Sequence, residues 1–566
     1  MGSNDTNIVK SPYKSLIKST PDVSITDFLF ESLDMNYELL QDQIWVQDTL
    51  DGSFYKFKDI KPMTRKIASG LTRLGFKKGD VLCFATTNVD LIYLVQLSVW
   101  ICGGALRGLH PNDTKEDYER EVKEVRGRFM LFDTKTCSKM KWASQQLGWD
   151  VQVVSIGGGV EDATAIEDMI ANDDCSFYPH DVQINTKEDI CMIVPTNGST
   201  GPPKAVTHTH HSMVALYSSF GAPNKITESR EVGRIALSMA GNHLISAYCG
   251  VTASILYGFS LLSNSQFDLK TLHSMIAKYK PESVLLYPYA ANIFIQSDDL
   301  YKYDLTSVKY VFSGGSVFTV ATAKLFASKL PQVKLMMLYG MSEILITTFS
   351  SVVKNENISS ERKISGIVIG TSNGREYISC GKVLPSCEAK IVDPIKRCDL
   401  GRNKRGILWM KCPYMMKGYL DPKSAKGHVL KLEEDGWFDT GDIGYFDEND
   451  NLYILDRARF TFMYKNKLVC PSEIEDIIMR NSGVSIAGVI GVDHPIHTTC
   501  ARAYIVLKPN YKITEEEMIN YVAERADDHM QLHGGVVFLD ELPESRGGKI
   551  NRAELYNMAK REMNGA

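Results

Sequence analysis

The chain has 566 residues, of which 44% are hydrophobic and 23% charged, the balance of a soluble globular protein with several domains. Its formal net charge of −5 argues against a protein that binds nucleic acid through bulk positive charge. The twelve cysteines are scattered and form no C-x-x-C motif, which fits a reducing compartment and excludes a zinc knuckle or a dithiol redox motif.

The two ends of the chain carry at most a weak targeting signal. The N-terminal stretch MGSNDTNIVKSPYK is polar and lacks the apolar core of a signal peptide. It matches the loose N-myristoylation pattern at Gly2 and Thr6, a short pattern that often arises by chance. The C-terminal stretch REMNGA is not the peroxisomal S-K-L signal. We therefore expect a cytoplasmic protein.

The first elements in chain order predict parallel sheets covered by helices. Residues 62–77 have apolar positions at helical spacing, and a turn and a buried strand follow in KKGDVLCFATT. The same helix–turn–strand unit returns over 318–346. Two uncharged or nearly uncharged runs, 91–109 and 244–262, approach the length of a membrane span. Their small and polar residues favour burial between sheet layers, so we expect no integral membrane span.

The last third of the chain changes character twice. From about 376, short strands alternate with Gly, Pro and Asn-Asp turns, which predicts a β-rich, more antiparallel region up to 455. Beyond 470, the pattern predicts a helix at 472–481, strands at 484–492 and 501–508, and a helix introduced by a capping box at Thr514 and Glu517. We therefore predict an α/β protein: a large domain (1–455) with two parallel-rich sheets and a β subdomain (about 376–455), then a small α+β domain (456–566).

A Gly- and hydroxyl-rich loop is the most informative motif. VPTNGSTGPPKAVTHTH (194–210) follows the apolar strand DICMIV and carries the single cation Lys204, a composition that can wrap phosphate oxygens. It is not a Walker A loop, because Ala205 replaces the Mg²⁺-binding hydroxyl. A flexible surface turn is the structural alternative. The histidines at 208, 210 and 211 have no carboxylate or Cys beside them, which disfavours a metal site.

Four further motifs end strands or turns with polar residues. KLMMLYGMSEI (334–344) places Ser342 and Glu343 after a strand, where a carboxylate can hold Mg²⁺ and an exposed Tyr339 can stack on a base. Its alternative is a helix N-cap. In SGGSVF (313–318) the glycines permit close approach to a ligand. WFDTGDIGYFD (437–447) puts Asp442 in a Gly-flanked turn, and LPESRGGKINR (542–552) puts Lys549 in a Gly-Gly loop.

In this order the motifs resemble those of the adenylate-forming superfamily, over about residues 60 to 555. TNGSTGPPKAV is similar to S-S/G-G-T-T-G-x-P-K-G, YGMSE to Y-G-x-T-E, TGDIGYFDENDNLYILDR to the T-G-D motif that ends in D/G-R, and GGKINR to G-K-x-x-R. Within this superfamily, the motifs are most similar to those of the 4-coumarate–CoA ligase and luciferase-like group. The resemblance implies that a small-molecule carboxylic acid attacks ATP, with Mg²⁺, to give an acyl-adenylate and pyrophosphate. A thiol, usually CoA, then displaces AMP.

The resemblance also implies roles for individual residues. Residues near the β- and γ-phosphates would be Thr196, Ser199, Thr200, Gly201 and Lys204. The rest of the nucleotide site would comprise Gly314, Gly315, Tyr339 near adenine, Gly340, and the ribose-binding Asp442 and Arg457. Ser342 would meet the α-phosphate, Glu343 would hold Mg²⁺, and Lys549 would bridge the carboxylate and the α-phosphate. His243 takes the position of the family's acyl-site His or aromatic residue, and a buried core histidine is its alternative.

The largest departures from the family pattern lie in LDRARFTFMYKNK (455–467), which in relatives is a hinge about which the small domain moves. The family reads D-R-x-K-x-x-I-K-x-x-G; here the hinge Asp456–Arg459 ends in Arg instead of Lys, and Met463 and Asn466 replace the second Lys and the Gly. The resemblance favours an acid–CoA ligase. The departures leave two alternatives: an adenylating enzyme whose second step is impaired or uses another acceptor, and a non-catalytic acyl- or nucleotide-binding relative. The first alternative includes luciferase-like oxidation, which Met463 disfavours because it replaces a lysine that relatives place against the adenylate.

Overall fold

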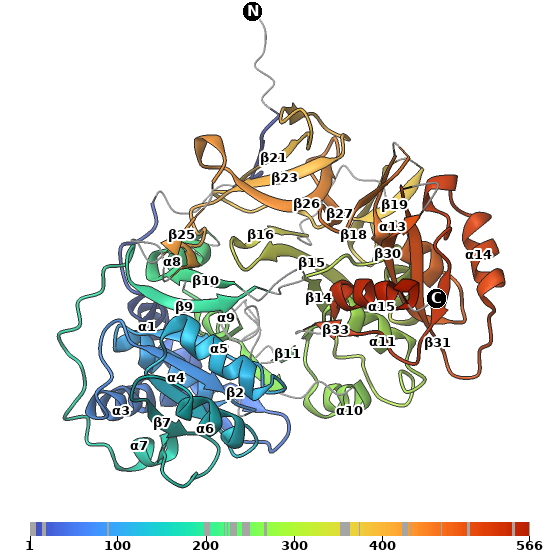
Figure 1. The fold of residues 1–566 in the computed structure, drawn as a ribbon. Coiled ribbons are helices and arrows are strands. Elements are labelled where there is room, and N and C mark those ends of the chain that lie inside the picture. Colours follow the sequence, from blue (N-terminus) through green and yellow to red (C-terminus); the bar gives the residue numbers. More distant parts are fainter. Residues whose placement is uncertain are drawn as a thin grey trace, which may run out of the picture.

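The computed structural model of the chain describes residues 7–13, 19–87, 90–196, 204–219, 221–222, 225–226, 235–239, 250–264, 269–350, 363–372, 374–421, 428–430, 432–465, 467–494, 498–545 and 549–564. Within these ranges, two nine-stranded sheets form most of the N-terminal part, a six-stranded sheet lies beside them, and a smaller α+β part ends the chain (Figure 1). The predicted α/β fold with two parallel-rich sheets is confirmed.

The first nine-stranded sheet is parallel at its centre and antiparallel at one edge. Its strands, in spatial order, are β25 (His428–Val429), β24 (Gly418–Leu420), β10 (Ala205–Thr209), β9 (Ile190–Pro195), β5 (Ala105–Gly108), β4 (Val81–Ala85), β6 (Phe129–Phe132), β7 (Gln152–Ser155) and β8 (Thr164–Ala165). From β9 to β8 every pairing is parallel, whereas β10 turns back against β9 and also pairs with β24. The Gly- and hydroxyl-rich segment 196–204, which we call the phosphate-facing loop after its predicted role, therefore joins two neighbouring strands, β9 and β10.

The second nine-stranded sheet carries the other motifs. Its strands, in spatial order, are β20 (Lys382–Val383), β16 (Leu345–Phe349), β15 (Lys334–Met341), β14 (Tyr310–Gly314), β13 (Ser283–Leu285), β11 (Ile235–Met239), β12 (Ser260–Asn264), β2 (Ile44–Asp48) and β3 (Phe54–Lys56). Pairings from β15 to β2 are parallel, and β15 forms a tight hairpin with β16. The carboxyl ends of β14 and β15 thus lie side by side.

Helices connect the strands of these sheets and cover their faces. They are α1 (Ile25–Met35), α2 (Tyr37–Leu40), α3 (Ile60–Arg73), α4 (Leu91–Ile101), α5 (Lys115–Val125), α6 (Cys137–Gln145), α7 (Ile166–Asn172), α8 (His210–Ser219), α9 (Gly250–Tyr257), α10 (Leu269–Tyr279), α11 (Pro288–Gln296) and α12 (Val320–Lys329). α3 and β4 confirm the helix and strand expected within 62–87, and α12 and β15 confirm the later repeat of that unit.

One apolar core joins the two large sheets, and α4 lies inside it. Every residue from Leu91 to Trp100 is buried, and Asp90 caps the helix by accepting from the Leu91 N–H. The run 91–109 therefore forms a buried helix and strand β5, as its composition indicated. The described part of the second run forms α9 and β12, and residues 244–249 lie outside the described ranges. No described helix is long and apolar enough to cross a membrane.

The β-rich region forms a separate antiparallel sheet. Its strands are β1 (Val9–Lys10), β21 (Glu388–Val392), β22 (Asp399–Leu400), β23 (Gly406–Lys411), β26 (Phe438–Phe446) and β27 (Leu452–Arg457). A further small sheet comprises β17 (Lys363–Ile364), β18 (Ile367–Ser372) and β19 (Arg375–Ile378). The N-terminal strand β1 pairs with β21 and forms one edge of this sheet, and β27 forms the other edge.

The C-terminal part has its own apolar core. Its elements are β28 (Phe462–Tyr464), β29 (Lys467–Val469), α13 (Pro471–Met479), β30 (Val484–His494), β31 (Thr498–Leu507), α14 (Glu515–Ala523), β32 (Val536–Phe538), β33 (Glu544–Ser545), β34 (Lys549–Ile550) and α15 (Arg552–Asn564). The capping box is present: the Glu517 N–H donates to Thr514 Oγ1 at 3.2 Å, and the Thr514 N–H to Glu517 Oε2 at 2.7 Å. In Figure 1 these red elements lie beside β18, β19 and α11.

Candidate active site

A cavity of about 1100 Å³ lies where the second large sheet meets the C-terminal part. Ligands of α/β proteins bind beyond the carboxyl ends of parallel strands. Gly315 follows β14 at this edge, and Ser342 follows β15. Residues of β27, α13 and 550–552 line the other side. The cavity therefore brings together motifs that lie more than two hundred residues apart in the sequence.

Thr196 and Lys204, which flank residues 197–203 of the phosphate-facing loop, are hydrogen-bonded to each other. The Thr196 N–H donates to the Lys204 carbonyl at 2.9 Å, and the Lys204 N–H donates to Thr196 Oγ1 at 2.9 Å. Both residues line the cavity. Ser199, Thr200 and Gly201 lie outside the described residues. The two ends of the loop are thus held together, and Lys204 is positioned at the cavity wall.

The YGMSE motif forms a tight hairpin turn rather than the N-terminus of a helix. β15 runs to Met341 and β16 starts at Leu345, with Ser342 and Glu343 between them. A Cβ on Gly340 would lie 1.8 Å from the Leu345 carbonyl oxygen, so only glycine fits there. Leu345 itself has a φ of 52°, a strained value for a branched residue. This close turn presents Ser342 and Glu343 to the cavity.

Tyr419 connects the phosphate-facing loop with this turn. Its hydroxyl donates to Glu343 Oε1 at 2.8 Å, and the Lys204 ammonium lies 4.7 Å from the centre of its ring. The Met416 N–H holds the Glu343 carbonyl at 2.8 Å. Burial and the Glu343 carboxylate raise the pKa of Tyr419 well above its usual range, so the hydroxyl stays a proton donor. A cation and a carboxylate are thus arranged about one aromatic ring.

Tyr339, Asp442 and Arg457 form a second polar group in the same cavity. The Tyr339 hydroxyl donates to Asp442 Oδ2 at 2.7 Å, and Arg457 Nε lies 2.8 Å from Asp442 Oδ1. Burial raises the pKa of the Asp442 carboxyl, while the Arg457 guanidinium and the Tyr339 hydroxyl stabilise its charged form. The charge of the Asp442 carboxylate raises the pKa of Arg457. The carboxylate is therefore oriented by one donor on each oxygen.

Two expectations about this group were wrong. Tyr339 is only 8% exposed, because its ring packs in the core and its hydroxyl is held by Asp442, so it does not present an exposed face. Asp442 does not lie in a turn: it belongs to strand β26 and pairs in register with Arg457 of β27. The flanking Gly441, with φ of 68°, bends the strand without ending it.

The two glycines of SGGSVF were expected to permit close approach of a ligand, and only Gly315 lines the cavity. A Cβ on Gly314 would lie 2.4 Å from the Leu338 carbonyl oxygen, so this glycine permits close approach of the neighbouring strand β15, not of a ligand. Gly315 has a φ of 86° and lines the cavity. The pair therefore turns the chain sharply at the carboxyl end of β14.

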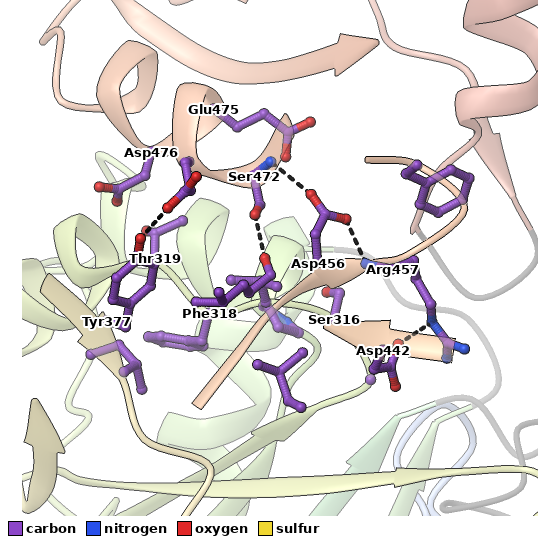
Figure 2. Close-up of a pocket in the computed structure, with 18 of the residues that line it drawn as sticks. Ser316, Phe318, Thr319, Tyr377, Asp442, Asp456, Arg457, Ser472, Glu475 and Asp476 are labelled. Carbon is purple, nitrogen blue, oxygen red and sulfur yellow. Dashed lines mark hydrogen bonds and ion pairs between the residues drawn. The ribbon is translucent and has the colours of Figure 1, made fainter. Parts of the chain in front are cut away.

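The segment 455–459 joins the large sheet region to α13 through Asp456 (Figure 2). Asp456 Oδ1 accepts from the Arg457 N–H at 2.8 Å, and Oδ2 accepts from the Ser472 N–H at 2.9 Å in the first turn of α13. The Ser472 hydroxyl also donates to the Leu455 carbonyl. A carboxylate at a helix N-terminus satisfies an otherwise unpaired donor and the helix dipole. Asp456 thus links β27 to α13 at the wall of the cavity.

A second contact between the two parts centres on Glu473. Its carboxylate lies 3.1 Å from Arg405 Nη1 and accepts from the Tyr377 hydroxyl. Arg405 Nη2 also donates to that hydroxyl at 2.8 Å, and Arg375 donates to the Glu473 carbonyl oxygen at 3.4 Å. The Glu473 side chain is 4% exposed, so these donors compensate a nearly buried charge. We call Tyr377, Arg405 and Glu473 the interdomain triad.

His243 and Lys549 are the remaining predicted catalytic residues. His243 lies in 240–249, outside the described residues. Lys549 starts strand β34, which pairs with β33, and the following residues 550–552 line the cavity. The backbone of the Lys549 segment therefore borders the cavity. In the hinge region, Met463 lies on β28 and is 47% exposed, while Asn466 lies outside the described residues.

Sequence reasoning missed several residues that the fold brings to the site. Tyr419 and the interdomain triad gave no signal by spacing, because their partners are distant in the chain. The stretch MKGYL around Tyr419 has an aromatic residue after a glycine in a predicted β region, and this is the only hint that the sequence offers. Glu473 lies within the helix predicted at 472–481, and no pattern in the sequence singled it out.

Two protein-family models match most of the chain. A sequence model described as "AMP-binding enzyme" matches residues 41–420, and one described as "AMP-binding enzyme C-terminal domain" matches residues 473–549. The chain belongs to the AMP-binding enzyme family. The membership expected from the motifs, in the adenylate-forming superfamily, is confirmed. The phosphate-facing and hairpin motifs lie within the first match, and the second match runs from Glu473 in α13 to Lys549.

Individual relatives of this AMP-binding enzyme include ligases and a luciferase. It is 28% identical to 4-coumarate–CoA ligase 1 of Petroselinum crispum over 89% of each chain. It is 30% identical to luciferin 4-monooxygenase of Nipponoluciola cruciata, over 67% of this chain and 65% of that protein. Among solved structures, ATP-bound MatB from Rhodopseudomonas palustris has a TM-score of 0.77 at 19% identity, covering 95% of this chain and 99% of that chain. The last comparison shows a common fold.

Proposed function

We propose that the protein activates a carboxylic acid with ATP and transfers the acyl group to CoA. In the first step, a carboxylate oxygen attacks the α-phosphorus of ATP, the bond to the β-phosphate oxygen breaks, and pyrophosphate leaves. In the second step, the CoA thiol sulfur attacks the acyl carbon, the thiol proton is lost, and AMP leaves. Acid, ATP and CoA are thus the small-molecule partners, and the cytoplasm stays the expected location.

The observation that carries this proposal is the convergence of two polar groups on one cavity. Lys204, Tyr419 and Glu343 form the first group, and Tyr339, Asp442 and Arg457 form the second. The first group supplies the Lys204 cation and the Glu343 carboxylate, a hard oxygen ligand, as a triphosphate with its metal requires. The other supplies an oriented carboxylate, as ribose hydroxyls require. A nucleoside triphosphate needs both kinds of group within one site.

The residues at the hairpin turn fit a Mg²⁺ ion. Glu343 is 7% exposed and lines the cavity, and its Oε1 accepts from Tyr419. No described residue donates to its Oε2, which leaves a carboxylate oxygen for a hard cation. When bound, Mg²⁺ would neutralise charge on the phosphate oxygens. Ser342, beside Glu343, is proposed to contact the α-phosphate, and Lys204 the outer phosphates with Thr196, Ser199, Thr200 and Gly201.

We assign the ribose to Asp442 and Arg457 and the adenine side of the cavity to Tyr339, Gly315 and Gly340, which line it. Lys549 is proposed to neutralise the charge that grows between the acid carboxylate and the α-phosphate, since its segment borders the cavity. His243 is proposed to face the acyl group. The chain would divide into a large domain (1–455) and a small domain (456–566), with Asp456–Arg459 as the hinge.

A second candidate function keeps adenylation but passes the acyl group to another acceptor. Met463 supports it, because this side chain is 47% exposed on β28 and lies opposite the exposed Leu468 of β29. The resemblance places a lysine at that position, in the part that serves the second step. An apolar pair there presents no charge to the phosphates of CoA.

Product analysis separates the two functions. The protein is incubated with ATP, Mg²⁺ and a panel of carboxylic acids, and pyrophosphate is measured; CoA is then added, and AMP and thioester are measured. We expect pyrophosphate with at least one acid and thioester after CoA is added. Pyrophosphate without thioester would favour the second function. Neither product with any acid would contradict both and leave only a binding function.

A further inference from the structure

His208 connects the strand that leaves the phosphate-facing loop with the hairpin turn. It lies on β10, four residues after Lys204, and its side chain is fully buried. Its Nε2 lies 2.7 Å from the Ser342 carbonyl oxygen, and its Nδ1 lies 3.4 Å from Ser212 Oγ. The pairing of β10 with β9 shifts between His208 and Thr209. A bulge of this kind re-aims a side chain, here toward the turn.

The imidazole of His208 acts as a hydrogen-bond donor to the turn. Burial lowers the pKa of His208 to about 4, so the ring is neutral at physiological pH and carries one N–H. Because a carbonyl oxygen only accepts, the contact with Ser342 places that N–H on Nε2. The neutral ring holds the turn without placing a positive charge beside the proposed cation site.

This hydrogen bond fixes the peptide between Ser342 and Glu343. In a planar trans peptide the carbonyl and the following N–H point in opposite directions. With the Ser342 carbonyl held by His208, the Glu343 N–H is directed away from His208. No described residue accepts a hydrogen bond from this N–H, and Ser342 and Glu343 both line the cavity. The N–H is therefore free to donate to an anionic oxygen of a bound ligand.

We propose that His208 is a positioning residue for adenylation: by holding the Ser342 carbonyl, it aims the Glu343 N–H and the Ser342 and Glu343 side chains at the nucleotide phosphates. The Glu343 carbonyl and carboxylate are fastened independently, by the Met416 N–H and the Tyr419 hydroxyl. His208 is the contact that sets the orientation of the peptide itself. The proposal rests on the proposed function for its catalytic consequence, but not for the effect on the turn.

His210 provides a matched control two residues away. Its side chain is also fully buried, but its Nδ1 accepts from the Ile25 N–H at 3.3 Å, at the start of α1. His210 is not among the residues that line the cavity. Substitution of His210 therefore removes a buried imidazole of the same chain segment without touching the turn. His208→Gln keeps an N–H donor at about the reach of Nε2, whereas His208→Leu removes it.

The first experiment measures amide hydrogen exchange over residues 340–346 in the ligand-free protein. The loss of a buried hydrogen bond in His208→Leu is expected to raise exchange roughly tenfold to a hundredfold. His208→Gln is expected to stay near wild type, and His210→Leu to leave these amides unchanged. Equal exchange in wild type and His208→Leu would overturn the proposal. If His208→Leu does not fold, His208→Asn, whose amide is too short to reach Ser342, is compared with His208→Gln.

The second experiment measures binding of the α,β-methylene analogue of ATP with Mg²⁺, and the rate of pyrophosphate release at saturating substrates. His208→Leu is expected to weaken binding and slow release by roughly tenfold or more, with the KM of the acid unchanged and with recovery in His208→Gln. A merely structural role would lower all activities equally in both variants. If wild type binds the analogue but releases no pyrophosphate with any acid, the proposed function fails, and exchange and binding still decide the role of His208.

Discussion

The interdomain triad makes a quantitative prediction about the contact between the two parts of the protein. Arg405→Met leaves the Glu473 carboxylate, 4% exposed, without its cation. Removing one partner of a buried ion pair costs about 3–5 kcal/mol. Since about 1.4 kcal/mol is a factor of ten, the population in which α13 separates from the large domain should rise roughly a hundredfold to several thousandfold. Glu473→Gln keeps an acceptor and leaves the charge on Arg405, whose side chain is 21% exposed and therefore partly solvated, so it should cost less, about 1 kcal/mol or roughly fivefold.

Hydrogen exchange of the Ser472 amide is the appropriate assay, because that N–H joins α13 to Asp456 of β27, a strand of the six-stranded sheet. Amides of β31, inside the C-terminal core, are the internal control and should not change. In Arg405→Met/Glu473→Gln no buried charge remains, and exchange should fall back toward wild type. The reasoning is refuted if Arg405→Met exchanges like wild type, or if the double variant exchanges as fast as Arg405→Met.

Three further predictions concern Lys549, the segment around Met463, and the buried His210. Lys549→Ala should lower the rate of pyrophosphate release by at least about a hundredfold while binding of the ATP analogue stays within about threefold, and full retention of activity would contradict the assigned role. Met463→Lys combined with Asn466→Gly should raise the yield of thioester relative to pyrophosphate; an unchanged ratio would show that these positions do not limit the second step. Burial lowers the pKa of His210 to about 4 in the folded protein from its ordinary value of 6.5. The unfolded state therefore binds more protons below pH 6.5, and stability falls as pH falls toward 4, by about 2 kcal/mol at pH 5. The melting temperature should therefore drop less with acid in His210→Asn, and an unchanged pH dependence would contradict this.

The sequence was sufficient where the signal is local. The capping box at Thr514, the fully apolar α4 and the helix–strand unit at 318–346 each depend on residues within a few turns of one another, so composition and spacing predicted them. The family and the order of the motifs were readable for the same reason. The hairpin turn at Ser342 and Glu343 was predicted as a site but not as a turn, because the requirement for Gly340 comes from the opposite strand.

Contacts between distant segments were not readable from the sequence. Tyr339 was expected to be exposed, because nothing near it in the chain announces that Asp442 will bind its hydroxyl. Asp442 was expected in a turn, because a Gly-Asp pair is typical of turns, and only the pairing of β26 with β27 makes it a strand residue. The roles of Tyr419 and Glu473 could be recognised only from the fold, which places Glu343 beside Tyr419 and Arg405 beside Glu473.

The central claim is that a carboxylate oxygen attacks the α-phosphorus of ATP in this cavity. The most direct test uses an acid that supports pyrophosphate release, labelled with ¹⁸O in both carboxylate oxygens, and follows the label by mass spectrometry after CoA is added. The account predicts AMP that carries one ¹⁸O atom and a thioester that carries the other. Unlabelled AMP, or label recovered in inorganic phosphate or pyrophosphate, would contradict it.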